Sequence, residues 1–131
     1  MSVALQQLAR QLREEDTPIS PHVIAPDEAA TFAPPGEYAF VIEAVREGYL
    51  LHYGEPRLLA GHDPDLGLLA GDYLYALGIE RLAALGDTGA VHRLADLIST
   101  CAQLHTEDRA DEVPAAWEDV IQHILSPKDA T

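Results

Sequence analysis

The chain has 131 residues and is 47% apolar, which suits a single domain over 1–131 and excludes a wholly disordered chain. Its formal net charge is −14, so its surface repels phosphate backbones and anionic lipid, and we expect no nucleic-acid partner. The single cysteine cannot form an internal disulfide, and the sequence contains neither a secretory signal nor an apolar run of membrane-spanning length. We therefore expect a cytoplasmic protein.

Apolar residues repeat at helical spacing in five segments and no strand pattern is evident, which predicts an all-α helical bundle. The first helix ends near Glu15. Five prolines between Asp16 and Gly36 then forbid a continuous helix, so we expect a proline-rich arm at 16–36 that is more mobile or more extended than the rest. The arm is expected to pack through Ile19, Val23, Ile24 and Phe32.

The second helix is predicted to begin near Glu37 and to end before Gly54 and Pro56. One apolar face carries Tyr38, Val41, Ile42, Val45, Tyr49 and His52. Glu43, Arg46 and Glu47 share the opposite side, which we interpret as the polar face of an amphipathic helix.

The stretch LGLLAGDYLYALGIERLAALGD at 66–87 predicts a third helix, almost wholly apolar apart from Asp72, Glu80, Arg81 and the final Asp87. Gly67, Gly71 and Gly78 fall on one side at about 100° per residue. Glycine weakens a helix by up to ~1 kcal/mol relative to alanine, but it allows another backbone to come close. We therefore expect a central helix of the bundle that is crossed tightly on at least two sides.

A different side of this helix combines small, acidic and apolar residues: Asp65, Asp72, Ala76 and Ala83, with Leu69 and Glu80 nearby. Two interpretations of Asp72 stay open. This side is either a solvent-exposed strip, or Asp72 is a buried carboxylate hydrogen-bonded to a neighbouring helix. In the second case it would pair with Arg46, Arg81 or a histidine.

The segment before the third helix, His62-Asp63-Pro64-Asp65, offers Asp63 or Asp65 as the residue that caps the helix. His62, Asp63 and Asp65 could also bind a divalent cation, but capping explains them without a metal and is the favoured interpretation.

The fourth helix follows Gly86 and is capped by Asp87 or Thr88. Its expected inner face comprises Val91, Leu94, Ala95, Ile98, Cys101, Ala102 and His105. The fifth helix begins near Pro114, and its expected inner residues are Trp117, Val120, Ile121, Ile124 and Leu125.

Cys101 and His105 lie four residues apart and within reach of each other. The pair is either a nucleophile with its base, half of a metal site, or a core thiol beside a partly buried histidine. His52 ends the apolar face of the second helix in the same way. With Asp72, these residues form a candidate interior polar cluster of Asp72, His52, Cys101 and His105.

The nine residues LLAGDYLYA at 68–76 resemble the LLAGDxLxA segment of the trans-isoprenyl diphosphate synthase, or polyprenyl synthetase, family. LADLISTCAQLHTE at 94–107 is similar to the helix that follows it there, and the resemblance covers roughly 57–107. It implies part of the isoprenoid synthase fold, in which these helices contribute to a dimer interface. The family holds magnesium and diphosphate with two aspartate-rich motifs, whereas this sequence contains no Asp-Asp pair.

We therefore expect no prenyl transfer, no cofactor, and no catalytic or metal-binding residues. The predicted function is that of a non-catalytic interaction subunit, which forms a homodimer or pairs with a larger prenyl synthase-like protein. The expected interface lies on the third and fourth helices, at Gly67, Gly71, Gly78, Ala95 and Ala102. The alternative is a small enzyme or metal-binding protein that uses the interior polar cluster.

Overall fold

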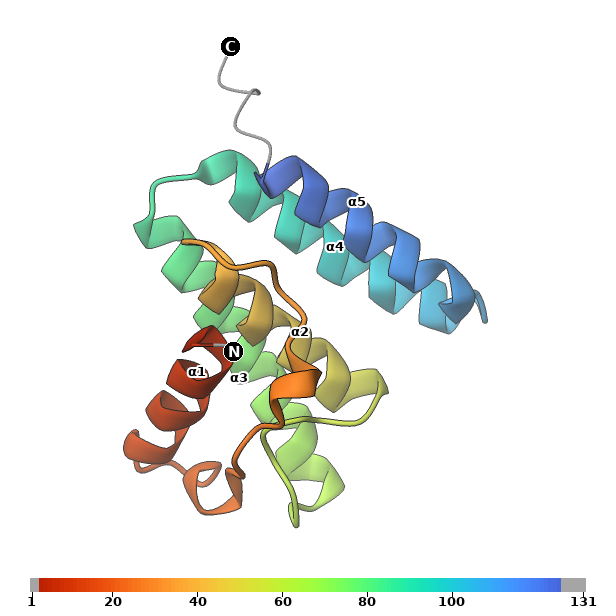
Figure 1. The fold of residues 1–131 in the computed structure, drawn as a ribbon. Coiled ribbons are helices and arrows are strands. Elements are labelled where there is room, and N and C mark those ends of the chain that lie inside the picture. Colours follow the sequence, from red (N-terminus) through yellow and green to blue (C-terminus); the bar gives the residue numbers. More distant parts are fainter. Residues whose placement is uncertain (1–2, 126–131) are drawn as a thin grey trace. The chain divides into compact units, whose positions relative to one another are not determined.

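The computed structural model describes residues 3–125, apart from the side chain of Glu28. These residues form five α-helices and no strand, which confirms the all-α prediction. The helices are α1 (Val3–Glu14), α2 (Ala39–Tyr53), α3 (Pro64–Ala84), α4 (Thr88–Thr106) and α5 (Val113–Leu125) (Figure 1). Within the described part of the chain, no helix combines the length and the apolar character needed to cross a membrane.

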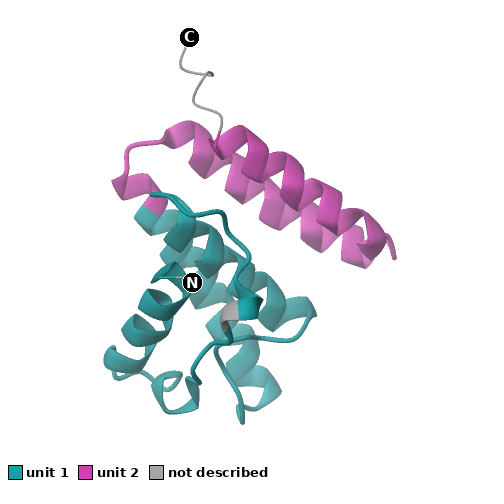
Figure 2. Ribbon diagram, viewed as in Figure 1, with its two compact units in different colours: residues 1–81 teal, residues 82–131 magenta. Residues whose placement is uncertain are grey.

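The chain divides into two compact units, unit 1 (residues 1–81) and unit 2 (residues 82–131) (Figure 2). The division falls inside α3, whose last residues belong to unit 2. The single domain expected from chain length stays a prediction.

Unit 1 is built on an apolar core to which α1, the arm, α2, α3 and the loop before α3 all contribute. The predicted inner face of α1 is confirmed, because Leu5, Leu8, Ala9 and Leu12 are all buried. The remaining members of this cluster are Ile19, Ala44, Leu58, Leu59, Ala70, Leu74 and Leu77. Three of them, Ala70, Leu74 and Leu77, follow the i, i+4, i+7 spacing that puts one stripe of α3 against the core.

α2 and α3 pack closely because glycines lie on both helices. A Cβ atom added to Gly48 would lie 2.9 Å from the Gly71 carbonyl oxygen, and one added to Gly78 would lie 2.6 Å from Val45 Cγ2. The close approach predicted from the glycines of α3 is thus confirmed, but the approaching helix is α2 of the same chain. The expected use of Gly67, Gly71 and Gly78 in a subunit interface is wrong, since all three are buried within their own chain.

The helix ends follow local signals. The Asp63 carboxylate accepts a hydrogen bond from the Leu66 N–H at 2.7 Å, and Asp87 accepts one from the Ala90 N–H at 3.0 Å. Each carboxylate satisfies an N–H that lacks a partner within the first turn. Gly86 ends α3 with φ of +82°, a left-handed conformation that glycine adopts without strain. The predicted caps at Asp63 and Asp87 are therefore confirmed.

The arm is not extended throughout. It contains two 3₁₀ turns, Ser20–His22 and Glu28–Ala30. Backbone hydrogen bonds join it to the loop before α3, from the Ile24 N–H to the Leu58 carbonyl at 2.7 Å and from the Ala60 N–H to the His22 carbonyl at 3.0 Å. Ile19 is buried as predicted, whereas Ile24 is exposed because its backbone, not its side chain, makes the contact.

Unit 2 contains α4 and α5 packed along each other. The buried residues of this unit include Ala90, Leu94, Leu97, Cys101, Leu104, Val113, Trp117 and Ile124. The inward positions expected for Ala95 and Ala102 are wrong, since both are exposed. Leu97 and Leu104 are buried beside the predicted Leu94, because leucine buries far more apolar surface than alanine.

Candidate functional site

Glu43 and Glu47 of α2 are both fully buried, with 0% exposure. The polar face predicted for α2 is therefore wrong at these two positions. α2 is surrounded on nearly all sides, as its run of buried residues from Val41 to Val45 shows. A carboxylate in such a place is stable only when it is paired and fully hydrogen-bonded.

Arg57, in the loop before α3, provides that pairing. Its Nη1 lies 2.6 Å from Glu43 Oε1 and its Nε lies 2.8 Å from Glu47 Oε1, while only 10% of its side chain is exposed. The same guanidinium donates to the backbone carbonyls of Ala30 at 3.0 Å and Glu43 at 3.2 Å. We call these three residues the Glu43–Arg57–Glu47 cluster.

The second oxygen of each carboxylate accepts two backbone N–H groups. Glu43 Oε2 accepts from Phe32 at 2.8 Å and Ala33 at 2.9 Å, and Glu47 Oε2 accepts from Arg57 at 2.8 Å and Leu58 at 2.9 Å. Each carboxylate oxygen thus has a protein partner. The cluster fixes the arm and the loop to α2, and its arrangement is that of a structural support.

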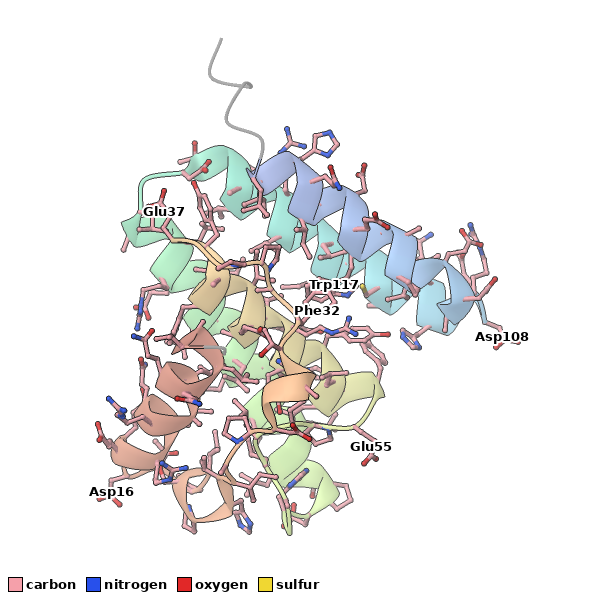
Figure 3. The ribbon with its side chains drawn as sticks, in the orientation of Figure 1. Asp16, Phe32, Glu37, Glu55, Asp108 and Trp117 are labelled. Atoms are coloured by element: carbon pink, nitrogen blue, oxygen red, sulfur yellow. The ribbon has the colours of Figure 1, made fainter. Side chains whose placement is uncertain are left out.

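Arg46, the third residue of the predicted polar face, lies over the Phe32 ring with its Cζ 4.1 Å from the ring centroid. Phe32 is labelled in Figure 3, at the point where the arm passes α2. A guanidinium over an aromatic face is attracted by the ring quadrupole. This contact adds a second attachment of the arm, and it confirms the predicted packing of Phe32.

The structure joins two residues of the predicted polar cluster, His52 and Asp72. His52 Nε2 lies 3.0 Å from Asp72 Oδ1, with 18% of the histidine side chain and 70% of the aspartate side chain exposed. Asp72 is thus solvent-exposed and also paired with a histidine of α2, so each of the two interpretations is right in part. An interior position for Asp72 is wrong, because most of its side chain is exposed.

The His52 ring fills the space that the absence of a side chain leaves at Gly71. A Cβ there would lie 2.8 Å from His52 Cδ2 and Nε2. The ring also stacks on Tyr75, with centroids 5.3 Å apart and planes inclined by 14°. This environment orients the imidazole toward Asp72, an arrangement that can hold a proton between the two groups.

The other two residues of the predicted cluster lie in unit 2. Cys101 is buried on α4, and His105 is partly exposed one turn later. Among residues 3–125, no group of three or more His, Cys, Asp or Glu side chains is placed to hold a metal ion. His62, Asp63 and Asp65 are therefore not assembled as a cation site, and the Asp63 carboxylate serves as the cap described above.

A cleft of about 590 Å³ opens in unit 1 where α1, the end of the arm and the start of α2 meet. Most of its lining is apolar or small. Its polar side chains, Gln7, Thr31 and Glu37, are all exposed, so the cleft contains no buried charged group that would select a ligand.

The side of α3 opposite its buried stripe of Ala70, Leu74 and Leu77 is exposed along unit 1, and we call it the outer face of α3. It comprises Asp65, Leu68, Leu69, Asp72, Ala76 and Glu80. Leu68 is 50% exposed and Leu69 is 66% exposed. The sequence indicated this side through Asp65, Asp72, Ala76, Leu69 and Glu80, and it missed Leu68.

No protein-family model matches the chain, and neither a curated protein nor a solved structure matches it. The resemblance of 57–107 to the polyprenyl synthetase family stays a prediction. The Glu43–Arg57–Glu47 cluster and the outer face of α3 therefore have to be interpreted from their own chemistry.

Proposed function

We propose that the protein is a non-catalytic interaction subunit that binds a protein partner along the outer face of α3. The supporting observation is the exposure of two consecutive leucines, Leu68 and Leu69, on a helix whose glycine side is packed against α2. Single exposed leucines are common on protein surfaces, but neighbouring ones on a rigid element are typical of contact sites.

Two kinds of partner are possible, a second copy of this chain or a different protein. A homodimer would have to use the outer face of α3, because the glycine side already packs against α2. Pairing with a larger prenyl synthase-like protein is supported by the resemblance of 57–107 alone. The absence of an Asp-Asp pair from the sequence agrees with a silent subunit in either version.

The second candidate, a small enzyme, is favoured only by the His52–Asp72 pair. A carboxylate that orients a histidine is one part of a general acid-base site. The substitution Asp72→Asn would abolish turnover in such an enzyme. It would leave partner binding through Leu68 and Leu69 largely intact.

Affinity capture from native extract tests the proposal. We expect a stoichiometric partner to be captured by the unmodified protein and lost with the double substitution Leu68→Ser/Leu69→Ser. Leu85→Ser is the matched control, because Leu85 is 45% exposed but lies beyond the end of α3. A partner retained by Leu68→Ser/Leu69→Ser and lost with Leu85→Ser would overturn the proposal.

A further inference from the structure

The outer face of α3 is acidic as well as apolar. Asp65, Asp72 and Glu80 are exposed along it at separations of seven and eight residues, which places them about two turns apart. Leu68, Leu69 and Ala76 lie between them. The face thus has a row of carboxylates about 22 Å long, with exposed apolar side chains between them and on both sides of the row.

The basic residue closest in sequence does not neutralise this row. Arg81 is the only Lys, Arg or His of the α3 segment 64–81. Its Cζ lies 4.1 Å from the Phe40 ring centroid, and its Nη2 donates to Gln11 Oε1 at 2.9 Å, so it is directed toward α1 and α2. His52 pairs with Asp72 but carries a charge only when protonated.

The α1 side of the face carries further negative charge. Tyr73 donates a hydrogen bond to Glu15 Oε1 at 2.7 Å. Partial burial, this hydrogen bond and the nearby charges of Glu15 and Glu80 raise the pKa of Tyr73 to about 12. Loss of the phenol proton would add a negative charge to a surface that is already negative.

This charge pattern disfavours a second copy as the occupant of the face. Two copies related by a twofold axis would bring their rows of carboxylates together, and each chain has a formal net charge of −14. Anionic lipid and nucleic acid are repelled for the same reason.

We infer that the outer face of α3 binds a basic amphipathic helix of a partner protein. This inference rests on the proposed function and names the class of partner. The helix would place an apolar stripe over Leu68, Leu69 and Ala76, with Lys or Arg seven to eight residues apart opposite Asp65, Asp72 and Glu80. Helix recognition by anchors at i, i+3, i+4 and i+7 has this geometry, and Ala76 allows the two helix axes to approach to about 8–10 Å.

A fluorescent synthetic helix of about 18 residues made of leucine, alanine and lysine provides the probe. Its anisotropy is titrated with the full chain at low and moderate salt. We expect saturable binding that weakens as salt rises, and no binding of the same peptide with glutamate in place of lysine. Equal binding of the acidic peptide would overturn the inference.

Variants locate the binding on the chain. Asp72→Asn/Glu80→Gln is expected to weaken binding about tenfold, since it removes two exposed ion pairs with the peptide. Glu107→Gln/Glu112→Gln in unit 2 changes the net charge equally and is expected to leave binding unchanged. Equal weakening by both variants would show nonspecific attraction and overturn the inference.

Leu68→Ser/Leu69→Ser separates the two proposals. If this variant abolishes peptide binding while Asp72→Asn/Glu80→Gln has no effect, the contact surface stands and the basic class of partner is wrong. If the charge variant weakens binding and the leucine variant does not, the proposed contact surface is wrong. Light scattering on the same samples adds a third outcome, because a dimer dissociated by Leu68→Ser/Leu69→Ser would identify a second copy as the occupant and overturn the inference.

Discussion

Each compact unit contains an arginine that binds two glutamates, and the two arginines differ in how far they are exposed to solvent. Arg57 is 10% exposed and its partners Glu43 and Glu47 are fully buried. Arg109 is 51% exposed and its partners Glu107 and Glu112 are 41% and 48% exposed. The ion-pair distances are nearly the same in both, at 2.6 to 2.9 Å.

The difference lies in what each arginine holds together. Arg57 connects α2, the arm and its own loop, and its glutamate partners lie 10 and 14 residues away in sequence. Arg109 bonds to residues two and three positions away and fixes only the turn between α4 and α5. Buried ion pairs are costly to break on one side, whereas exposed pairs are screened by water and salt. Contacts of the first kind hold unit 1 together, and local contacts of the second kind shape the turn in unit 2.

The largest expected effect is that of Arg57→Met, which would leave two buried carboxylates without a cation. We expect it to lower the free energy of unfolding by about 3–5 kcal/mol, measured by urea denaturation of the full chain. Arg57→Lys should give an intermediate loss, because a single ammonium cannot reproduce the geometry of Nε and Nη1 together. Arg109→Met is the matched control and should change the midpoint little; equal losses from Arg57→Met and Arg109→Met would remove the distinction between the two clusters.

A second pair of substitutions compares the packing of the two units. Gly48→Ala puts a Cβ 2.8 Å from Tyr75 Cδ1 and 2.9 Å from the Gly71 carbonyl oxygen, which cannot move without displacing α3. We expect a loss of about 1–3 kcal/mol. Gly89→Ala on α4 meets only Asp87 Oδ1 at 3.6 Å, and the better helix propensity of alanine should stabilise by up to ~1 kcal/mol. Thermal denaturation should show a lower midpoint temperature for Gly48→Ala and a higher one for Gly89→Ala. A Gly48→Ala protein as stable as the unmodified protein would contradict the close crossing of α2 and α3.

Tyr73 provides a smaller, pH-dependent test of the long-range contacts in unit 1. Its pKa is raised from 10.0 to about 12 in the folded chain, by partial burial first and by Glu15 next. The stability that this shift contributes is fully present below pH 10 and is lost as the pH rises through 12. Ultraviolet titration should show one late tyrosine that is absent from Tyr73→Phe and titrates earlier in Glu15→Gln. A late phase that persists in Tyr73→Phe would refute the assignment.

The smallest expected effect concerns the exposed cluster. The Glu107 pKa is lowered mainly by its hydrogen bonds from Gln103 and Arg109, and the Glu112 pKa is lowered mainly by its hydrogen bond from Arg109. Their contribution is present above the ordinary glutamate pKa of 4.5 and is lost as the pH falls below it. Carboxyl titration by NMR should show both values move up toward 4.5 in Arg109→Met. No movement would mean that these ion pairs do not persist in solution.

The sequence predicted those features of the fold that depend on neighbouring residues. Helix periodicity, the caps at Asp63 and Asp87 and the termination at Gly86 are all decided within a few residues. The glycines of α3 also correctly indicated a close crossing, although they could not identify α2 as the partner helix. Gly48, in the middle of α2, was the residue in the sequence that could have indicated α2 as the helix that packs against α3.

The sequence did not predict the burial of Glu43 and Glu47. Their spacing of four residues is typical of an exposed helix face, and their burial depends on Arg57 and on the backbone of the arm. Asp72 presented the opposite case, because an isolated carboxylate in an apolar helix suggests burial and this one is exposed. Whether a charge is buried depends on partners that are distant in the chain, and periodicity contains no information on them.

The Glu43–Arg57–Glu47 cluster also limits how this chain can evolve. Replacing any one of the three residues leaves a buried charge or buried N–H groups without partners, so single steps away from the cluster are disfavoured. The three positions should therefore be inherited together and should change together, in a lineage that also remodels the arm. Exposed positions such as Glu107 and Glu112 carry no such restriction and can drift one at a time. Across descendants of this sequence, joint retention of Glu43, Glu47 and Arg57 would mark the chains that keep the fold of unit 1.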